Sequence, residues 1–584
     1  MKRFLGLLVL WVLWGCASKD VDLSEKLTPE EWDAAYCGGF ESFLTTTLEK
    51  YQNEVDQISR EYQIEQWKVE TADPEASQEK LTRLFEKLQA TVYNATLLNH
   101  AKGIDTAAEV VKSENCKFKG KVRRARQILE TSILTDPKVI EKERSNQELQ
   151  DKLMNQSNAF RIEMPGEKEP LSKALYGKKL RSLEDRKARQ ELYQKYNSAR
   201  AKKWNDWGLK ELFKARNEEG RLAGFKNYYE YRFFRSQLDY KNYRAQVEEV
   251  KTKLAPKVRR VLSRLGKQNK ISKVEAWDLG YLREKASSGE INEFLKNVPE
   301  TAVLEMARKF YSSLGIDIDS YQFTMDLFPR PGKNTHAFAM GVVAPHVDVQ
   351  GKLLSEPKAD IRFLANLKQP VKWDDTSTVI HELGHAIHYG EIRQPLGIFR
   401  GFGSVETEAI AMTLERMADS KEFIENVIPQ FASIPKSKLQ PLLKKQLKAA
   451  QVEQAFVLLR QIFFSDFEHE IYVNPDQDYS ALWSKMHQEY WGVEVPVENA
   501  DWDVEHFLMA PVYVQNYAIG ILMVEQFYES ILKDFKTSYQ SPKIGDKLRS
   551  HYFSPGLEHD YLTLTLIFTG KPLTAAAALG LIKD

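Results

Sequence analysis

The sequence lacks the features that mark several protein classes. Its 83 Lys and Arg residues nearly balance its 82 Asp and Glu residues, which leaves a formal net charge of +1. Without a basic excess, neither nucleic-acid binding nor electrostatic adhesion to a membrane is favoured. Only 29 glycines and 22 prolines occur in 584 residues, which excludes a low-complexity chain. Beyond the N-terminus, no apolar run is long enough to span a bilayer.

A strongly apolar run lies at the N-terminus of the sequence. Lys2 and Arg3 precede the apolar stretch 4–14, which is too short for a comfortable transmembrane helix and is typical of a secretory signal. This pattern predicts a signal peptide over residues 1–15, followed by a short polar tether over residues 16–28.

The end of the signal resembles the lipobox of bacterial lipoproteins, in which Cys16 becomes the lipidated first residue. Trp14 stands where that box has a smaller residue, so a simple secretion signal is the alternative. Ala17 after the cysteine fits sorting to the outer membrane. We therefore expect a lipoprotein of the bacterial cell envelope that is anchored to the outer membrane through Cys16 and faces the periplasm.

Two further cysteines, Cys37 and Cys116, complete the small cysteine content of the chain. In an oxidising compartment these two can form a disulfide. Two buried thiols are the alternative, because sequence alone does not show whether the residues lie close together.

Most of the chain has the apolar spacing of amphipathic helices. Apolar residues recur at intervals of three and four up to about residue 315, for example over 81–88, 122–134 and 247–265. Helices resume near the C-terminus, for example over 518–532. Neither an internal repeat nor a long Gly/Ser linker is present, so we predict one α-rich domain over residues 29–584.

The pattern changes between residues 320 and 370. The stretches 340–343 and 361–366 are short and β-rich, and they follow the loop-like stretch 328–333. These features predict a small β-sheet just before the motif described next.

A His-Glu-x-x-His motif occupies residues 381–385. In a helix, His381 and His385 lie one turn apart on one face, and two imidazoles at this spacing can bind one zinc ion. Glu382 lies about 100° around the helix from His381. From there its carboxylate can take a proton from the attacking water without binding the metal. We therefore predict one Zn²⁺ per chain.

A catalytic zinc site needs a third protein ligand. The ligand set of metzincins is excluded. That pattern has a Gly three residues and a third His six residues after the second His, whereas this chain has His388 and Glu391 at those positions. Glu406 and Glu408 on the following predicted helix are the alternatives. Glu408 begins an apolar helix face that would bury it, whereas we expect Glu406 at the exposed helix start, where an acid favours the helix dipole. We predict that Glu408 is the ligand.

Three further residues could support the metal ligands. His388 lies on the same helix face as the ligands, where it could contact them or act as a structural histidine. Asp375 and Glu415 are candidates to orient the ligand imidazoles. Each could equally be a helix cap or a surface carboxylate.

A segment near the C-terminus, residues 506–520, carries His506, Tyr513 and Tyr517. Hydrolysis of a peptide bond forms a tetrahedral oxyanion, and a well-placed phenol or imidazole donor can stabilise it by roughly 3 kcal/mol. On spacing alone, aromatic packing in the core is the stronger of the two interpretations.

Three stretches together resemble the zinc peptidases of the angiotensin-converting-enzyme family, namely 381–388, 407–412 and 506–520. The related thimet oligopeptidase and oligoendopeptidase F group is also similar, especially over 511–513 and 517–520. The resemblance covers roughly residues 30–570. It implies a mainly α gluzincin-type fold, a large helical ellipsoid with a deep central channel and a small β-sheet beside the zinc helix.

The resemblance also implies roles for individual residues. Glu382 would act as general base and acid, and Glu408 would complete the zinc ligands. Tyr517 would stabilise the oxyanion, and His506 would form a hydrogen bond to the substrate backbone.

Substrate contacts are implied as well. His336 and Ala337 would bind the peptide backbone, and Tyr513 resembles a tyrosine that contacts the C-terminal carboxylate of a peptide. Two positions depart from the converting-enzyme pattern, since Val504 and Asn516 replace a Lys and an Arg. These departures concern dipeptide release and chloride dependence, not hydrolysis.

The sequence therefore predicts a zinc peptidase that hydrolyses peptides in an enclosed channel by peptidyl-dipeptidase-like removal of C-terminal dipeptides. An oligoendopeptidase that cleaves short peptides internally is the alternative. An inactive zinc-retaining binding lipoprotein is an alternative of another class, against which Glu382 and the two tyrosines argue.

Overall fold

The computed structural model describes residues 37–110, 116, 118–164, 169–286, 289–500, 502 and 504–583. The predicted signal peptide (1–15), the predicted tether (16–28) and Cys16 lie outside the described residues. Among the helices of these described ranges, none has both the length and the apolar character of a bilayer-spanning segment.

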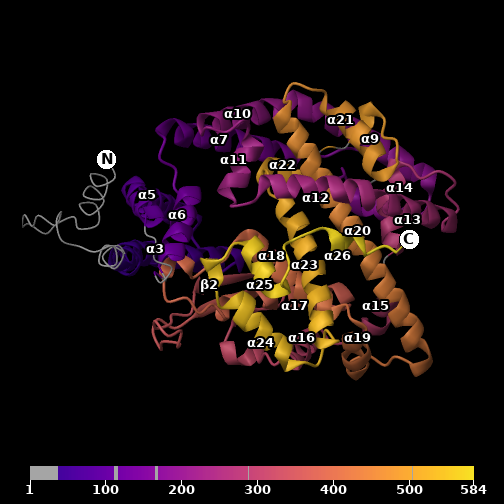
Figure 1. Cartoon of the computed structure of the whole chain (residues 1–584). Coiled ribbons are helices and arrows are strands. Elements are labelled where there is room, and N and C mark those ends of the chain that lie inside the picture. The colour runs from indigo at the N-terminus through magenta and orange to yellow at the C-terminus, as the bar shows by residue number, and fades with distance from the viewer. Residues whose placement is uncertain are drawn as a thin grey trace, which may run out of the picture.

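Helices dominate the described chain, as predicted, and in Figure 1 they form an upper and a lower group. The helices before the sheet are α3 (Glu49–Glu70), α4 (Gln78–Val92), α5 (Ala95–Val110), α6 (Lys119–Ser132), α7 (Pro137–Ala159), α8 (Lys173–Ser182), α9 (Arg186–Trp207), α10 (Leu209–Leu222), α11 (Tyr228–Arg235), α12 (Tyr240–Lys253), α13 (Ala255–Gln268), α14 (Ala276–Ala286), α15 (Glu290–Leu295) and α16 (Ala302–Ser313).

The helices after the sheet include both helices of the predicted metal site. They are α17 (Trp373–Gly390), α18 (Ser404–Ala418), α19 (Lys421–Val427), α20 (Lys436–Val473), α21 (Tyr479–Trp491), α22 (Glu505–Met509), α23 (Val514–Phe535), α24 (Pro542–Leu548), α25 (Tyr561–Thr569) and α26 (Ala576–Leu579). Short 3₁₀ or π turns lie at η1 (Phe43–Leu48), η2 (Ile318–Tyr321), η3 (Gly397–Phe399), η4 (Ile428–Gln430), η5 (Val497–Asn499), η6 (Arg549–Phe553) and η7 (Gly556–Glu558). The long helices α20 and α23 run between the upper and lower groups (Figure 1).

Most of the predicted helical stretches correspond to helices of the structure. The stretches 81–88, 122–134 and 518–532 fall largely within α4, α6 and α23. The stretch 247–265 is instead two helices, α12 and α13, which meet at Leu254. Pro256 explains the break, because proline lacks an amide proton and suits the first turn of a new helix.

A small three-stranded sheet lies beside α17, as predicted. Its strand order is β1 (Thr324–Asp326), β3 (Asp360–Leu364) and β2 (Phe338–Val343), with β1 parallel and β2 antiparallel to β3. Helix α17 contacts both β2 and β3. The edge strand β2 is thereby placed next to the helix that carries the His-Glu-x-x-His motif.

One large hydrophobic core runs through both groups of helices, from Leu134 to Ile582. A second cluster joins η1 and helices α5 and α6 to Phe399, and there Cys37 and Cys116 form a disulfide with their Cα atoms 5.7 Å apart.

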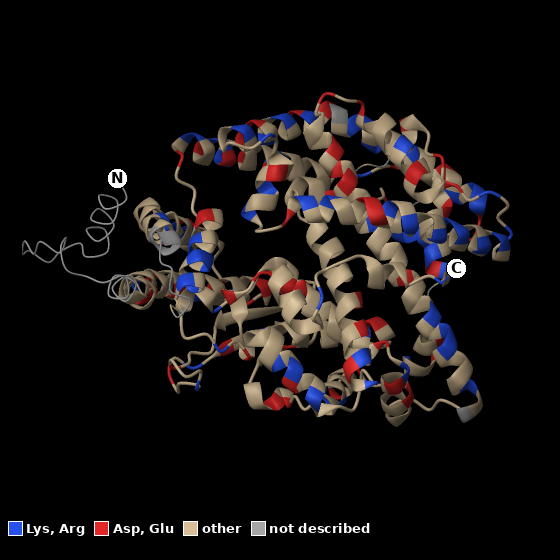
Figure 2. Cartoon of the chain, in the orientation of Figure 1, with Lys and Arg blue, Asp and Glu red and all other residues tan. Residues whose placement is uncertain are grey.

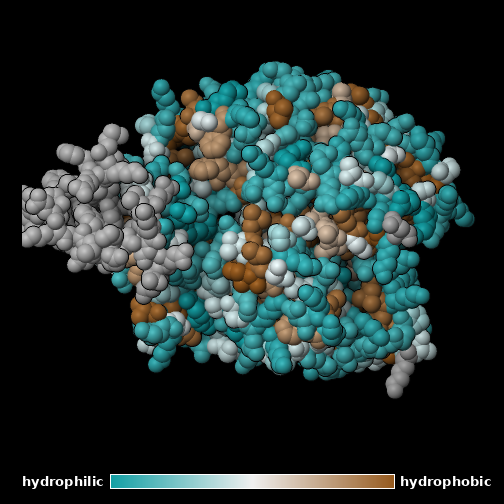
Figure 3. All heavy atoms as spheres, viewed as in Figure 1, coloured by the Kyte–Doolittle hydropathy of each residue, from teal (hydrophilic) through white to brown (hydrophobic). Residues whose placement is uncertain are grey.

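Charged residues lie mainly on the outer helices in Figure 2, while the first half of α23 is uncharged. The face drawn in Figure 3 is mostly hydrophilic, with separate small hydrophobic areas.

Gly384 in α17 lies at a close helix contact beside the motif. A Cβ atom at this position would lie 3.0 Å from Leu414 Cδ1 and 3.2 Å from Ala411 Cα, both in α18. The absence of a side chain at Gly384 therefore lets α17 and α18 pack closely at the level of His381 and His385.

We expect Gly384→Val to lower the unfolding free energy by about 1–3 kcal/mol, because the added side chain must displace α18. Chemical denaturation of metal-stripped protein measures this change without a contribution from bound metal. Gly120→Val is the matched control, since a Cβ at Gly120 in α6 meets no atom within 4 Å. Equal stability of the two variants would contradict close packing at Gly384.

Candidate metal site

Helices α17 and α18 bring the three predicted ligands together. The ligand atoms of His381, His385 and Glu408 all lie within 4.8 Å of one another. The two Nε2 atoms of the histidines are 3.1 Å apart, and His381 Nε2 lies 3.7 Å from Glu408 Oε2. Donors at the usual distances from a tetrahedral zinc ion are separated by about 3.3–3.6 Å. The two nitrogens and the carboxylate oxygen therefore fit a zinc ion.

A second group of potential ligands, Asp466, His469 and Glu470 in α20, differs in this respect. Asp466 Oδ1 lies 2.7 Å from Arg244 Nη1, and Oδ2 accepts a hydrogen bond from Tyr490 at 2.7 Å. Both carboxylate oxygens thus already have donors, one of them a cation. This group is a polar network within the protein and not a second metal site.

Residues of α18 contact the Nδ1 atom of each ligand imidazole, on the side of the ring opposite Nε2. His381 Nδ1 lies 3.2 Å from Glu415 Oε2, and His385 Nδ1 lies 2.7 Å from Thr407 Oγ1. An acceptor at Nδ1 fixes the ring and leaves Nε2 free to bind metal. The structure thus places Glu415 as an orienting group for His381. Thr407 was not predicted, because its pairing with His385 depends on how the two helices cross.

The other two residues considered as supports lie differently. Asp375 Oδ2 accepts a hydrogen bond from the Lys372 backbone N–H at 2.7 Å, so this carboxylate caps the start of α17. His388 is 1% exposed, its ring stacks on Phe402 with centroids 4.3 Å apart, and burial lowers its pKa to about 3. The structure therefore favours a cap for Asp375 and a packed, neutral structural histidine at His388.

The expected exposure of Glu406 is wrong. This residue is 7% exposed, and burial raises the pKa of its carboxyl to about 7. The side chain folds back toward Gly403, where a Cβ would lie 2.2 Å from Glu406 Oε2. The glycine makes room for a carboxyl that packs against the start of its own helix, whereas Glu408 lies with the histidines.

Glu382 lies between the ligands and the sheet. Its carboxylate accepts a hydrogen bond from the backbone N–H of Ala339 in β2. Burial raises the pKa of Glu382 to about 7, the charge of His381 opposes this shift, and the charge of Glu408 adds to it. A carboxyl in this environment can exchange a proton near neutral pH, as a general base requires.

The ligand histidines respond differently to the surrounding carboxylates. Burial alone would lower the pKa of His381, but the hydrogen bond and charge of Glu415 raise it to about 9. Burial and the neighbouring charge of His381 hold the pKa of His385 well below its usual value. The carboxylates thus favour positive charge at the point where the ligand atoms meet.

The predicted donor segment reaches this cluster from α22 and the start of α23. The rings of His506 and Tyr517 are 5.8 Å apart, and those of Tyr513 and Tyr517 are 5.4 Å apart. Burial and the charge of Glu408 raise the pKa of both tyrosines, so the phenols stay protonated and can donate hydrogen bonds. Both tyrosines are partly exposed and lie outside the buried core, in contrast to the core-packing interpretation.

The predicted peptide-binding residues lie just before β2. His336 is exposed, and its backbone N–H donates to Asn334 Oδ1 at 2.8 Å. Ala337 is two residues before Ala339, whose N–H bonds to Glu382. Substrate binding by His336 and Ala337 stays a prediction, but their position close to the Glu382 carboxylate suits it.

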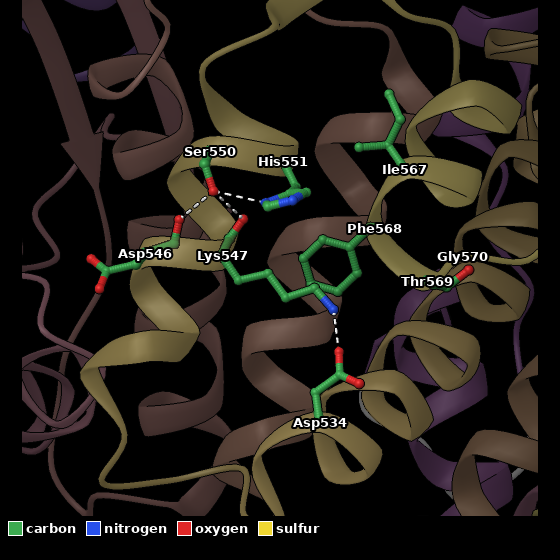
Figure 4. Close-up of a pocket in the computed structure, with 9 residues that line it drawn as sticks. All are labelled: Asp534, Asp546, Lys547, Ser550, His551, Ile567, Phe568, Thr569 and Gly570. Carbon is green, nitrogen blue, oxygen red and sulfur yellow. Dashed lines mark hydrogen bonds and ion pairs between the residues drawn. The ribbon is translucent and has the colours of Figure 1, made fainter.

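A cavity of about 540 Å³ at the other end of α23 is unrelated to this cluster (Figure 4). Asp534 in its wall is 17 residues after Tyr517, roughly 25 Å along the helix. Ser550 Oγ and His551 Nδ1 are 2.7 Å apart there, but Ser550 donates to the Asp546 carbonyl and Asp534 is paired with Lys547 at 2.6 Å. These contacts do not form a nucleophile–base–acid arrangement.

Comparison with known proteins agrees with this geometry. Residues 179–580, which include every residue of the ligand cluster and the donor segment, match the model of peptidase family M3. The chain belongs to peptidase family M3. Membership of this metallopeptidase family implies zinc as the metal of the His381, His385 and Glu408 cluster.

Two curated M3 relatives are both named oligopeptidase A. The chain is 22% identical to the Escherichia coli (strain K12) protein over 389 residues, which is 57% of this chain and 56% of that protein. It is 20% identical over 394 residues to the Haemophilus influenzae protein, covering 58% of this chain and 56% of that protein. The chain thus matches little more than half the length of each relative.

Two solved structures share the fold. A Pz peptidase A solved with an inhibitor has a TM-score of 0.61 at 14% identity and covers 96% of each chain. A putative oligoendopeptidase F has a TM-score of 0.61 at 13% identity, covering 98% of this chain and 97% of that one. These likenesses show a shared fold, and the family match places the chain in peptidase family M3 and not specifically in the angiotensin-converting-enzyme family.

We expect Thr407→Val and Glu415→Leu each to weaken zinc binding about 10–100-fold, because each removes the acceptor that orients a ligand imidazole. Zinc competition against a chromogenic chelator measures the affinity directly. Asp375→Asn serves as the control and should bind zinc as the wild type does. Unchanged affinity in both α18 variants would show that these contacts do not support the site.

Proposed function

We propose that the protein is a zinc-dependent peptidase that cleaves bonds inside short peptides. The observation that carries this proposal is the meeting of three elements: the ligands on α17 and α18, Glu382 held against β2, and the tyrosine pair at the start of α23. The M3 relatives named oligopeptidase A and the structural likeness to oligoendopeptidase F support internal cleavage as the activity.

The residues of the site divide the chemistry among them. His381, His385 and Glu408 would hold the zinc ion, which would supply Lewis-acid polarisation and lower the pKa of a water molecule. Glu382 takes the proton of the attacking water and later delivers it to the leaving amine nitrogen. Tyr517 donates a hydrogen bond to the oxygen of the scissile carbonyl as negative charge develops there. Entry of the peptide through an enclosed channel is part of the proposal.

Two positions favour internal cleavage over removal of C-terminal dipeptides. Recognition of a free carboxylate is strongest with a cationic partner. Val504 packs against the hydrophobic core, and Asn516 is buried with its Nδ2 donating to Ser404 Oγ at 3.0 Å. Neither position supplies the cation of the converting-enzyme pattern. Tyr513 remains the candidate carboxylate contact if dipeptides are released.

We expect peptides with free and with amidated C-termini to be cleaved internally at similar rates, because no free carboxylate is needed. Mass spectrometry of the products reads the cleavage positions. Loss of cleavage on amidation, with C-terminal dipeptides released from the free peptide, would instead establish the dipeptidase activity.

Glu382→Gln should lower the rate of peptide hydrolysis by at least about 10²-fold while zinc stays bound, since it removes the base. Wild-type turnover in that variant would contradict the mechanism.

The inactive binding lipoprotein predicts a different result in the same assay. Complete inactivity of zinc-loaded wild-type protein across a diverse peptide library would favour that alternative.

We also propose that Cys16 carries a lipid anchor, so that the peptidase faces the periplasm from the outer membrane. The N-terminal sequence pattern supports this placement, and so does the disulfide between Cys37 and Cys116, which is typical of an oxidising compartment.

In a Gram-negative host, we expect the full-length chain to incorporate a labelled fatty acid and to sediment with membranes. Cys16→Ser should do neither, because it removes the acylated thiol, whereas the control Ser18→Ala should do both. Unlabelled wild-type protein in the periplasmic fraction would contradict the anchor and support simple secretion.

A further inference from the structure

The donor segment is held from the upper group of helices, although its tyrosines act beside ligands in the lower group (Figure 1). Arg216 of α10 is 1% exposed and donates to the backbone carbonyls of Phe507 at 2.6 Å and Leu508 at 2.7 Å. These carbonyls directly follow His506. The buried guanidinium therefore fixes one end of the segment that connects α22 to α23.

The other end of this connection contains an unusual residue, Val512. Its φ angle is +53°, in the left-handed region that β-branched residues rarely adopt. Such a conformation persists only where the surroundings hold it. The backbone N–H of Val512 donates to Glu468 Oε1 at 2.9 Å, and its carbonyl accepts from the Gln515 side chain. Both polar groups of this residue are thus occupied by side chains.

Glu468 lies in α20 and is fully buried. Burial raises the pKa of its carboxyl to about 8, and Oε2 has no hydrogen-bond partner in the described part of the chain. A buried carboxyl with one unpaired oxygen is costly compared with an apolar residue of similar size. Its contact with Val512 is the feature of this position that an apolar side chain does not reproduce.

We propose that Glu468 is a positioning residue, which holds Val512 in its left-handed conformation and thereby places Tyr513 and Tyr517 beside the metal ligands. Tyr513 directly follows Val512 and is the N-cap of α23, and Tyr517 lies one helical turn later. A change in the Val512 backbone would rotate the chain at Tyr513 and shift the first turn of α23. The catalytic part of this inference rests on the proposed peptidase function.

Substitutions at Glu468 separate the hydrogen bond to Val512 from the ionisable carboxyl group. Glu468→Gln retains an oxygen that accepts from the Val512 N–H, so its kcat should stay within about twofold of wild type. Glu468→Leu removes the acceptor, and its kcat should fall about 10–100-fold with little change in KM or zinc content, because the misplaced phenol acts mainly in the transition state.

Ser465→Ala is the matched control. Ser465 lies one turn earlier in α20, is fully buried, and forms its hydrogen bond with Tyr229 at 2.7 Å, away from the donor segment. This variant also loses one buried hydrogen bond, but it should keep wild-type kcat. A comparable fall in kcat in Ser465→Ala would assign the effect to general weakening of α20 and overturn the proposal.

Hydrogen exchange followed by mass spectrometry tests positioning without any peptide substrate. Amides of residues 510–517 should exchange at least about tenfold faster in Glu468→Leu, while those of α17 stay protected and Glu468→Gln matches wild type. Unchanged exchange over 510–517, or faster exchange spread equally over α17, would overturn the proposal. If the wild-type protein lacks peptidase activity, the proposed function fails, whereas the exchange result still decides whether Glu468 positions the segment.

Discussion

The close contact between α17 and α18 is the interaction on which the site depends. Without a side chain at Gly384, the helices approach until the Glu408 carboxylate meets the imidazoles of His381 and His385. The same contact places Thr407 and Glu415 behind the two rings. One packing constraint thus determines the ligand set and its orientation together, because all of these side chains project from two helices whose spacing is fixed.

Electrostatics explains why a cation belongs at this contact. Glu382, Glu408 and Glu415 lie close to one another in a largely buried place, where ionised carboxylates are costly unless they are paired. Their combined charge raises the pKa of His381 although burial opposes it. A divalent ion meets the same demand for positive charge, and the hydrogen bond from Ala339 keeps Glu382 directed toward the sheet instead of the metal ligands.

The two groups of helices contribute different parts of the proposed active site. The lower group holds the metal ligands and Glu382, while Arg216 and Glu468 hold the backbone that carries the donor segment. Helix α23 joins these parts, since it begins at the tyrosines and packs along both α18 and α20. The placement of Glu382 relative to Tyr517, the proposed base and oxyanion donor, is therefore a property of the packing around α23, and no single sequence motif determines it.

Local spacing along the chain was enough to predict the helix at 381–385 and its metal-binding face, because contacts between positions i and i+4 arise within one helix. The helical class also followed from this periodicity, and the two longer strands followed from short β-rich stretches of the sequence. The role of Glu382 stays a prediction. Burial of Glu406, the pairing of Thr407 with His385, the cap at Asp375 and the contact of Glu468 with Val512 were decided by the tertiary structure alone. Each depends on which faces of distant segments meet, and that is set by packing of the whole core.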